Sequence, residues 1–84
     1  MRIDVTQEDI KNGQRGEPRC CPIALAATRV TGDEMSVGCR KIYRMGKENG
    51  DWISHHTPES AAAFINRYDS NCPVEPFSFD LIQD

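Results

Sequence analysis

Apolar and polar residues alternate at both ends of the chain, which is the pattern of a half-buried β-strand. Residues 1–5 read MRIDV, with apolar side chains at the third and fifth positions between charged ones. Residues 74–82 read VEPFSFDLI and alternate in the same way from Phe77 onward. Because Pro76 has no N–H to donate to a ladder, this second strand is expected to start at an edge or a bulge.

Two stretches in the first half carry the start and stop signals of helices. Thr6, with Asp9 three positions later, forms an imperfect capping box, and the short helix that it starts closes at Gly13. The charged loop QRGEPR follows. Pro22 then suits the first position of a helix, where a missing N–H costs nothing, which makes Cys21 the N-cap. The apolar stripe of this second helix consists of Ile23, Ala26, Ala27 and Val30, and Gly32 ends it.

The second half contains a predicted hairpin and a third helix. Strands over about residues 35–45 and 51–56 flank Asn49-Gly50, a strong turn signal for an antiparallel pair. Thr57 and Pro58 then stand as the N-cap and first residue of a helix. Its apolar stripe consists of Ala61, Phe64, Ile65 and Tyr68, and it ends before Pro73.

These elements follow one another in the order β-α-α-β-β-α-β, which indicates an α+β fold in two layers, a mostly antiparallel sheet with helices on one face. We expect one domain over residues 1–84, because two halves would each be too small to bury a useful core. A core of this size is marginal on its own, and a homodimer is the commonest support for it.

Charge is distributed unevenly along the chain. Residues 1–47 hold nine lysines and arginines against six acids, whereas residues 48–84 hold Arg67 against seven acids. The formal net charge of −3 argues against a protein that neutralises nucleic-acid phosphates. No apolar run is long enough to span a membrane and the N-terminus lacks a signal-peptide core, so we expect a cytoplasmic protein with reduced thiols.

Four sequence blocks resemble a family of small, largely uncharacterised proteins encoded by tailed bacteriophages and prophages. They are V-T-x-E-D-I-x-x-G at residues 5–13, C-P-I-A-L-A at 21–26, T-P-x-x-A-A-A-F-I at 57–65 and P-V-E-P-F-S-F-D-L at 73–81. The resemblance covers nearly the whole chain but implies no catalytic or binding residues. It implies action in the cytoplasm of the bacterial host, where small accessory proteins bind and redirect host or defence components.

Cysteine and histidine chemistry gives two hypotheses that the spacing does not favour. Cys20 or Cys21, Cys39, His55 or His56, and Cys72 are the candidate ligands of a structural zinc, but no C-x-x-C pair is present. A Cys21 thiolate at a helix start, with His55 or His56 as base, would be a nucleophile, but no third orienting group is evident. We therefore expect no catalytic residues, no metal and no cofactor.

Two sets of basic residues are candidates for binding. The first is a surface around Arg40, Lys41, Tyr43 and Arg44, where an aromatic side chain lies among cations. The second is an anion site formed by Arg15, Arg19, His55 and Arg67 near the start of the third helix.

The leading hypothesis is a non-enzymatic phage accessory protein that binds and modulates a bacterial host or defence-system protein through the first set. The alternative is a protein that sequesters an anionic small molecule, such as a nucleotide signal, through the second. A cysteine- or zinc-dependent enzyme is the third.

Overall fold

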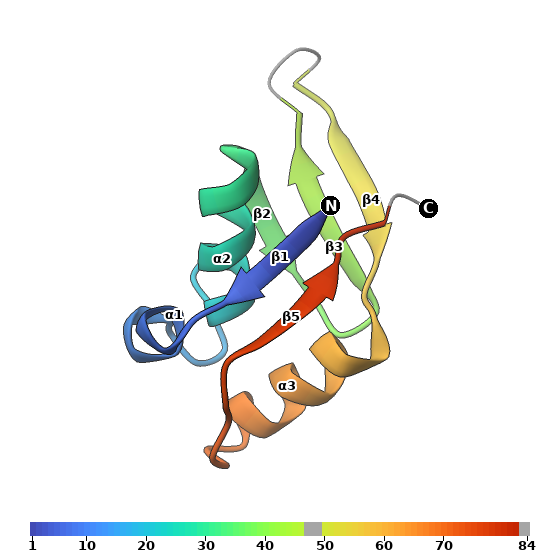
Figure 1. Cartoon of the computed structure of the whole chain (residues 1–84). Coiled ribbons are helices and arrows are strands. Elements are labelled where there is room, and N and C mark those ends of the chain that lie inside the picture. The colour runs from blue at the N-terminus through green and yellow to red at the C-terminus, as the bar shows by residue number, and fades with distance from the viewer. Residues whose placement is uncertain (47–49, 83–84) are drawn as a thin grey trace.

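Two antiparallel sheets and three helices make up the fold, in a computed structural model that describes residues 1–46 and 50–82 (Figure 1). The elements are β1 (Arg2–Val5), α1 (Gln7–Asn12), α2 (Pro22–Thr31), β2 (Glu34–Val37), β3 (Lys41–Met45), β4 (Trp52–His56), α3 (Glu59–Asp69) and β5 (Phe77–Asp80). One sheet pairs β1 with β5, and the other has the order β2-β3-β4. Helix α2 packs against a strand of each sheet, β1 and β2 (Figure 1).

The predicted α+β class with antiparallel sheets is confirmed, but the order β-α-α-β-β-β-α-β contains one strand more than predicted. The single strand expected over residues 35–45 is divided into β2 and β3 by a turn at residues 38–40, where the Gly38 N–H donates to the Lys41 carbonyl at 2.9 Å. The single predicted sheet is likewise two sheets, because the terminal strands pair with each other and not with the central ones.

The hairpin predicted between the two central strands is present, since β3 and β4 pair antiparallel. The turn of this hairpin was predicted at Asn49-Gly50, and Asn49 lies outside the described residues. Gly50 has a φ of 68°, a conformation that glycine adopts without strain. The Gly46 N–H closes the hairpin by donating to the Asp51 carbonyl at 3.1 Å.

Helix α3 begins one residue later than predicted, with Pro58 as its N-cap. The Thr57 side chain does not cap the helix, because its Oγ1 donates to the Gly38 carbonyl at 2.7 Å. The Thr57 N–H donates to the Arg40 carbonyl at 3.0 Å. These two hydrogen bonds fasten the turn between β2 and β3 to the start of α3.

The core lies between α2, α3 and the inward faces of both sheets. On α2, Ile23, Ala24, Ala26 and Ala27 are completely buried. Ile3 of β1, Met35 of β2 and Ile42 of β3 pack with them in the same cluster. Val30, predicted on the same stripe, is 46% exposed, so the buried face of α2 ends a turn earlier than its periodicity suggests.

A buried carboxylate ties α1 to the rest of the molecule. Thr6 and Asp9 form a complete capping box, in which each side chain accepts a hydrogen bond from the other's backbone N–H. The Arg29 guanidinium donates to both Asp9 oxygens, at 2.6 and 2.9 Å, and to the Asp4 carbonyl at 3.0 Å. Burial opposes ionisation, but the hydrogen bonds from Arg29 and Thr6 outweigh it and lower the pKa of Asp9.

Asp9→Asn is expected to reduce the free energy of unfolding at pH 7 by about 1–3 kcal/mol, because hydrogen bonds to a charged group are lost. The folded-state pKa of Asp9 lies below its unfolded value of about 3.9, so this stabilisation is present above that pH and is lost as pH falls through the folded pKa. Urea unfolding from pH 7 down to pH 2 measures both effects, with the exposed Glu34→Gln variant as control. An Asp9→Asn protein as stable as the control, with the same acid sensitivity as wild type, would contradict this role.

Candidate functional site

The three-stranded sheet has a core side and an outer side, and β3 shows the division. Successive side chains of a strand point to opposite faces. Ile42 is completely buried, whereas its neighbour Tyr43 is 42% exposed. Lys41 and Met45 share the outward face with Tyr43, and Arg44 shares the inward face with Ile42.

The strand register places a second aromatic side chain near Tyr43. Tyr43 lies between Ser36 of β2 and Ser54 of β4, two small residues. One row away, Met45 lies opposite Trp52, which is 40% exposed. Trp52 and Tyr43 are therefore diagonal neighbours across the hairpin, within reach of each other's large side chains.

The loop between α1 and α2 adds a cation to this surface. The Val37 N–H at the edge of β2 donates to the Pro18 carbonyl at 2.9 Å, which holds the loop against the sheet. The next residue, Arg19, places its guanidinium carbon 5.6 Å from the centre of the Trp52 ring, a cation–π distance.

These residues surround a shallow depression of about 380 Å³ lined by Arg19, Ser36, Tyr43 and Trp52. We call the surface made by Arg19, Ser36, Lys41, Tyr43, Met45 and Trp52 the aromatic face. It is wide and open, and it lacks the enclosure that a small-molecule site normally provides.

The structure separates the first predicted set of binding residues. Lys41 and Tyr43 lie on the aromatic face, and Arg40 lies in the exposed turn at the start of β3. Arg44 points to the other side of the sheet, where its Nη1 donates to Asp33 Oδ2 at 3.3 Å. Arg19 and Trp52 were absent from this set. The β3–β4 register places Trp52 beside Met45, but only the fold brings Arg19 to it.

The second predicted set is dispersed. Arg15 is bound to the end of α3, donating to the Tyr68 carbonyl at 2.9 Å and to Asn71 Oδ1 at 2.6 Å. Arg19 covers Trp52 on the aromatic face, and His55 is only 3% exposed in β4. Arg67 lines a different groove, beside α3.

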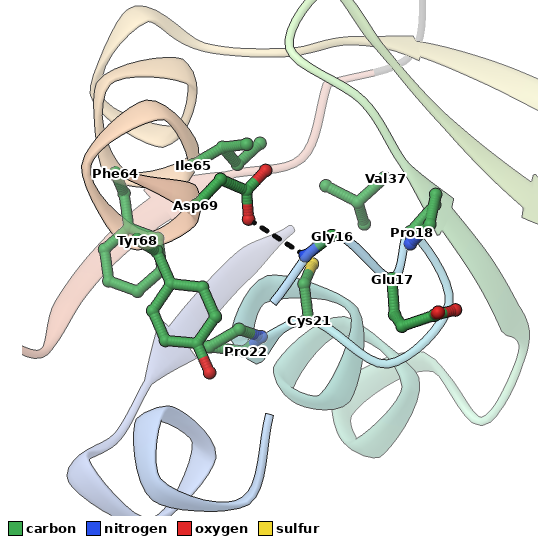
Figure 2. A pocket seen from close by; sticks show the side chains of 10 residues that line it. All are labelled: Gly16, Glu17, Pro18, Cys21, Pro22, Val37, Phe64, Ile65, Tyr68 and Asp69. Atoms are coloured by element: carbon green, nitrogen blue, oxygen red, sulfur yellow. Dashed lines mark hydrogen bonds between the residues drawn. The ribbon is translucent and has the colours of Figure 1, made fainter. Parts of the chain in front are cut away.

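Cys21 caps α2 as predicted, with its Sγ accepting from the Ala24 N–H at 3.4 Å. It lines a cavity of about 80 Å³ beneath residues 16–18, shown in Figure 2, where the Gly16 N–H also donates to Asp69 Oδ1 at 3.2 Å. Burial raises the pKa of the thiol, although backbone N–H groups partly offset it. A thiol with a raised pKa stays protonated at neutral pH and is a poor nucleophile. No histidine lines the cavity.

A metal-binding arrangement is not found in the part of the chain that the structure describes, where no three histidine, cysteine or acidic side chains are grouped to hold an ion. All four cysteines are free thiols, with Cys39 and Cys72 exposed. Among residues 1–46 and 50–82, no helix has the length and apolar character needed to cross a membrane.

Comparison with protein-family models, with curated proteins and with solved structures gives no match to this chain. The functional argument therefore depends on the surface itself.

Cys21→Ser is expected to keep the fold and to change the free energy of unfolding by about 1 kcal/mol or less, because serine supplies an acceptor for the same N–H. Cys21→Ala removes that acceptor and leaves a small void, so we expect it to be less stable than Cys21→Ser. Thermal unfolding of the two variants measures the difference. A Cys21→Ser protein that folds normally but has lost its biological activity would instead indicate thiol chemistry.

Proposed function

We propose that this protein is a non-enzymatic binding protein whose aromatic face docks on a partner protein. The observation that carries the proposal is the exposure of Tyr43 and Trp52 next to one another, 42% and 40% respectively, with Arg19 over the Trp52 ring. Tryptophan, tyrosine and arginine are the residues most enriched among those that dominate binding energy at protein interfaces.

The exposed parts of the two rings offer enough apolar area to anchor a partner. Covering the remaining surface of each ring would contribute roughly 2 kcal/mol at 25 cal/mol per Å². Both side chains project from paired strands, so the backbone that presents them is already ordered. Little conformational entropy is then lost on binding, since each ring has only two side-chain torsions.

The charges around the aromatic face favour an acidic partner surface. Arg2 forms an ion pair with Asp4, Arg29 with Asp9, and Arg44 with Asp33. Arg19 and Lys41 lie on the aromatic face, and Glu34 is an acid on the same side of the sheet. Arg40 is the exposed residue directly before Lys41. A complementary partner would carry carboxylates around an apolar side chain that fills the depression.

The resemblance to phage-encoded proteins indicates where such a partner is found. It suggests a bacterial host or defence-system protein, met in the host cytoplasm. A nucleic acid is a less suitable partner, because the whole chain carries a net charge of −3. The anionic-ligand alternative loses support, because its four residues lie in different places.

In affinity capture from bacterial lysate, wild type is expected to retain a bacterial protein that the double variant Tyr43→Ala/Trp52→Ala does not retain. The matched control is Val30→Ala, which removes an exposed apolar side chain from α2, outside the aromatic face. With the purified partner, each single substitution is expected to weaken binding about 5- to 30-fold, the range of an interface hot spot.

Three outcomes would overturn the proposal. The captured proteins could be the same for wild type and the double variant, the control could lose them equally, or nuclease treatment could abolish the capture. The last result would identify nucleic acid as the partner of this surface.

A further inference from the structure

A second depression lies on different elements, between α3 and residues 73–77. One face of α3 lines it, because Ser60, Ala63, Phe64 and Arg67 are spaced at i, i+3, i+4 and i+7. The opposite wall is the segment PVEPF, which leads into β5. Its volume is about 590 Å³, within the range of small-ligand sites. We call it the α3 groove.

The floor of the α3 groove is aromatic and firmly held. The Phe64 and Phe77 rings stack with their centres 4.9 Å apart. The Phe77 ring also stacks with the ring of Phe79, with centres 5.8 Å apart, and Phe79 is a buried core residue. Ala63, small and exposed, leaves the space above this floor open.

Two opposite charges line the α3 groove without neutralising each other. Arg67 projects from α3 and Glu75 belongs to the opposite wall. No ion pair joins them, and neither side chain has a hydrogen-bond partner among residues 1–46 and 50–82. The groove therefore offers one cation and one anion above an apolar floor.

We propose that the α3 groove binds an apolar α-amino-acid unit. That unit carries three groups that match the groove: a carboxylate for the Arg67 guanidinium, a neighbouring N–H or ammonium donor for Glu75, and an apolar side chain for the Phe64–Phe77 floor. Arginine binds carboxylates through two parallel hydrogen bonds, which fixes the orientation of the ligand. The unit is found in free amino acids and at the C-terminus of a peptide. This site is additional to the partner surface proposed above and does not depend on it.

The test is a titration of the ¹⁵N-labelled protein, followed by NMR, with three probes. N-acetyl-Gly-Gly-Phe has a free carboxylate, its C-terminal amide lacks one, and free phenylalanine adds an ammonium group. We expect chemical-shift changes confined to residues 60–67 and 73–77. The peptide acid, N-acetyl-Gly-Gly-Phe, is expected to bind at least fivefold more tightly than its C-terminal amide. Tighter binding of the peptide acid than of phenylalanine would identify a chain terminus as the ligand, and the reverse would identify a free amino acid.

Three variants assign the contacts. Arg67→Gln is expected to abolish the preference for the acid over the amide. Glu75→Gln is expected to weaken the binding of free phenylalanine more than that of the acetylated peptide, because only free phenylalanine brings an ammonium charge. Ala63→Leu fills the groove and is expected to remove binding of every probe, while leucine keeps the helix propensity high.

The melting temperature of each variant shows that it is folded, and Val30→Ala serves as the unaffected control. Equal affinity of the acid and the amide for the wild-type protein would overturn the proposal. So would the absence of binding, an unchanged preference in Arg67→Gln, or shifts that fall on the aromatic face.

Discussion

The close approach of α2 to its neighbours is the constraint on which the rest of the structure depends. Ala24, Ala26 and Ala27 are all completely buried, so most of the buried face of the helix consists of short side chains, with Ile23 as the larger one beside them. The same closeness holds at its start, where a Cβ on Gly13 would lie 2.6 Å from the Pro22 ring. The Tyr68 hydroxyl of α3 donates to the Gly13 carbonyl at 2.8 Å, so the end of α1, the start of α2 and α3 meet at one point.

This packing divides the aromatic residues into two groups. Phe64, Phe77 and Phe79 stack in series at the edge of the core, with Tyr68 adjoining Phe64. Tyr43 and Trp52 lie on the far side of the three-stranded sheet, where no helix covers them among the residues that the structure describes. The sheet face left uncovered by the helices is thus the one on which we propose that a partner docks, and the loop carrying Arg19 is fastened beside it through Pro18.

Sequence patterns predicted the features that depend on neighbouring residues. The Thr6–Asp9 capping box, the Cys21 cap before Pro22 and the alternation of the terminal strands all follow from contacts a few residues apart. The prediction of the α+β class followed from these local features.

Features that depend on distant residues were missed or only partly found. The division into two sheets arises from the pairing of β1 with β5, at opposite ends of the chain. The hydrogen bond from Thr57 to the Gly38 turn and the Arg19–Trp52 contact, which joins a loop to a strand 33 positions away, have no local signal. Arg44 and Tyr43 point to opposite faces of the sheet, because side chains alternate along a strand and β3 begins at Lys41.

The separation of core aromatics from surface aromatics can be tested by comparing Trp52→Ala with Phe79→Ala in urea unfolding at pH 7. Phe79 is 6% exposed, so its truncation is expected to cost about 3–5 kcal/mol, close to the whole stability of a small domain. Trp52 is 40% exposed, so its truncation is expected to cost about 1 kcal/mol or less. A loss for Trp52→Ala as large as that for Phe79→Ala would mean that Trp52 belongs to the core, and it would contradict the assignment of Trp52 to an exposed surface.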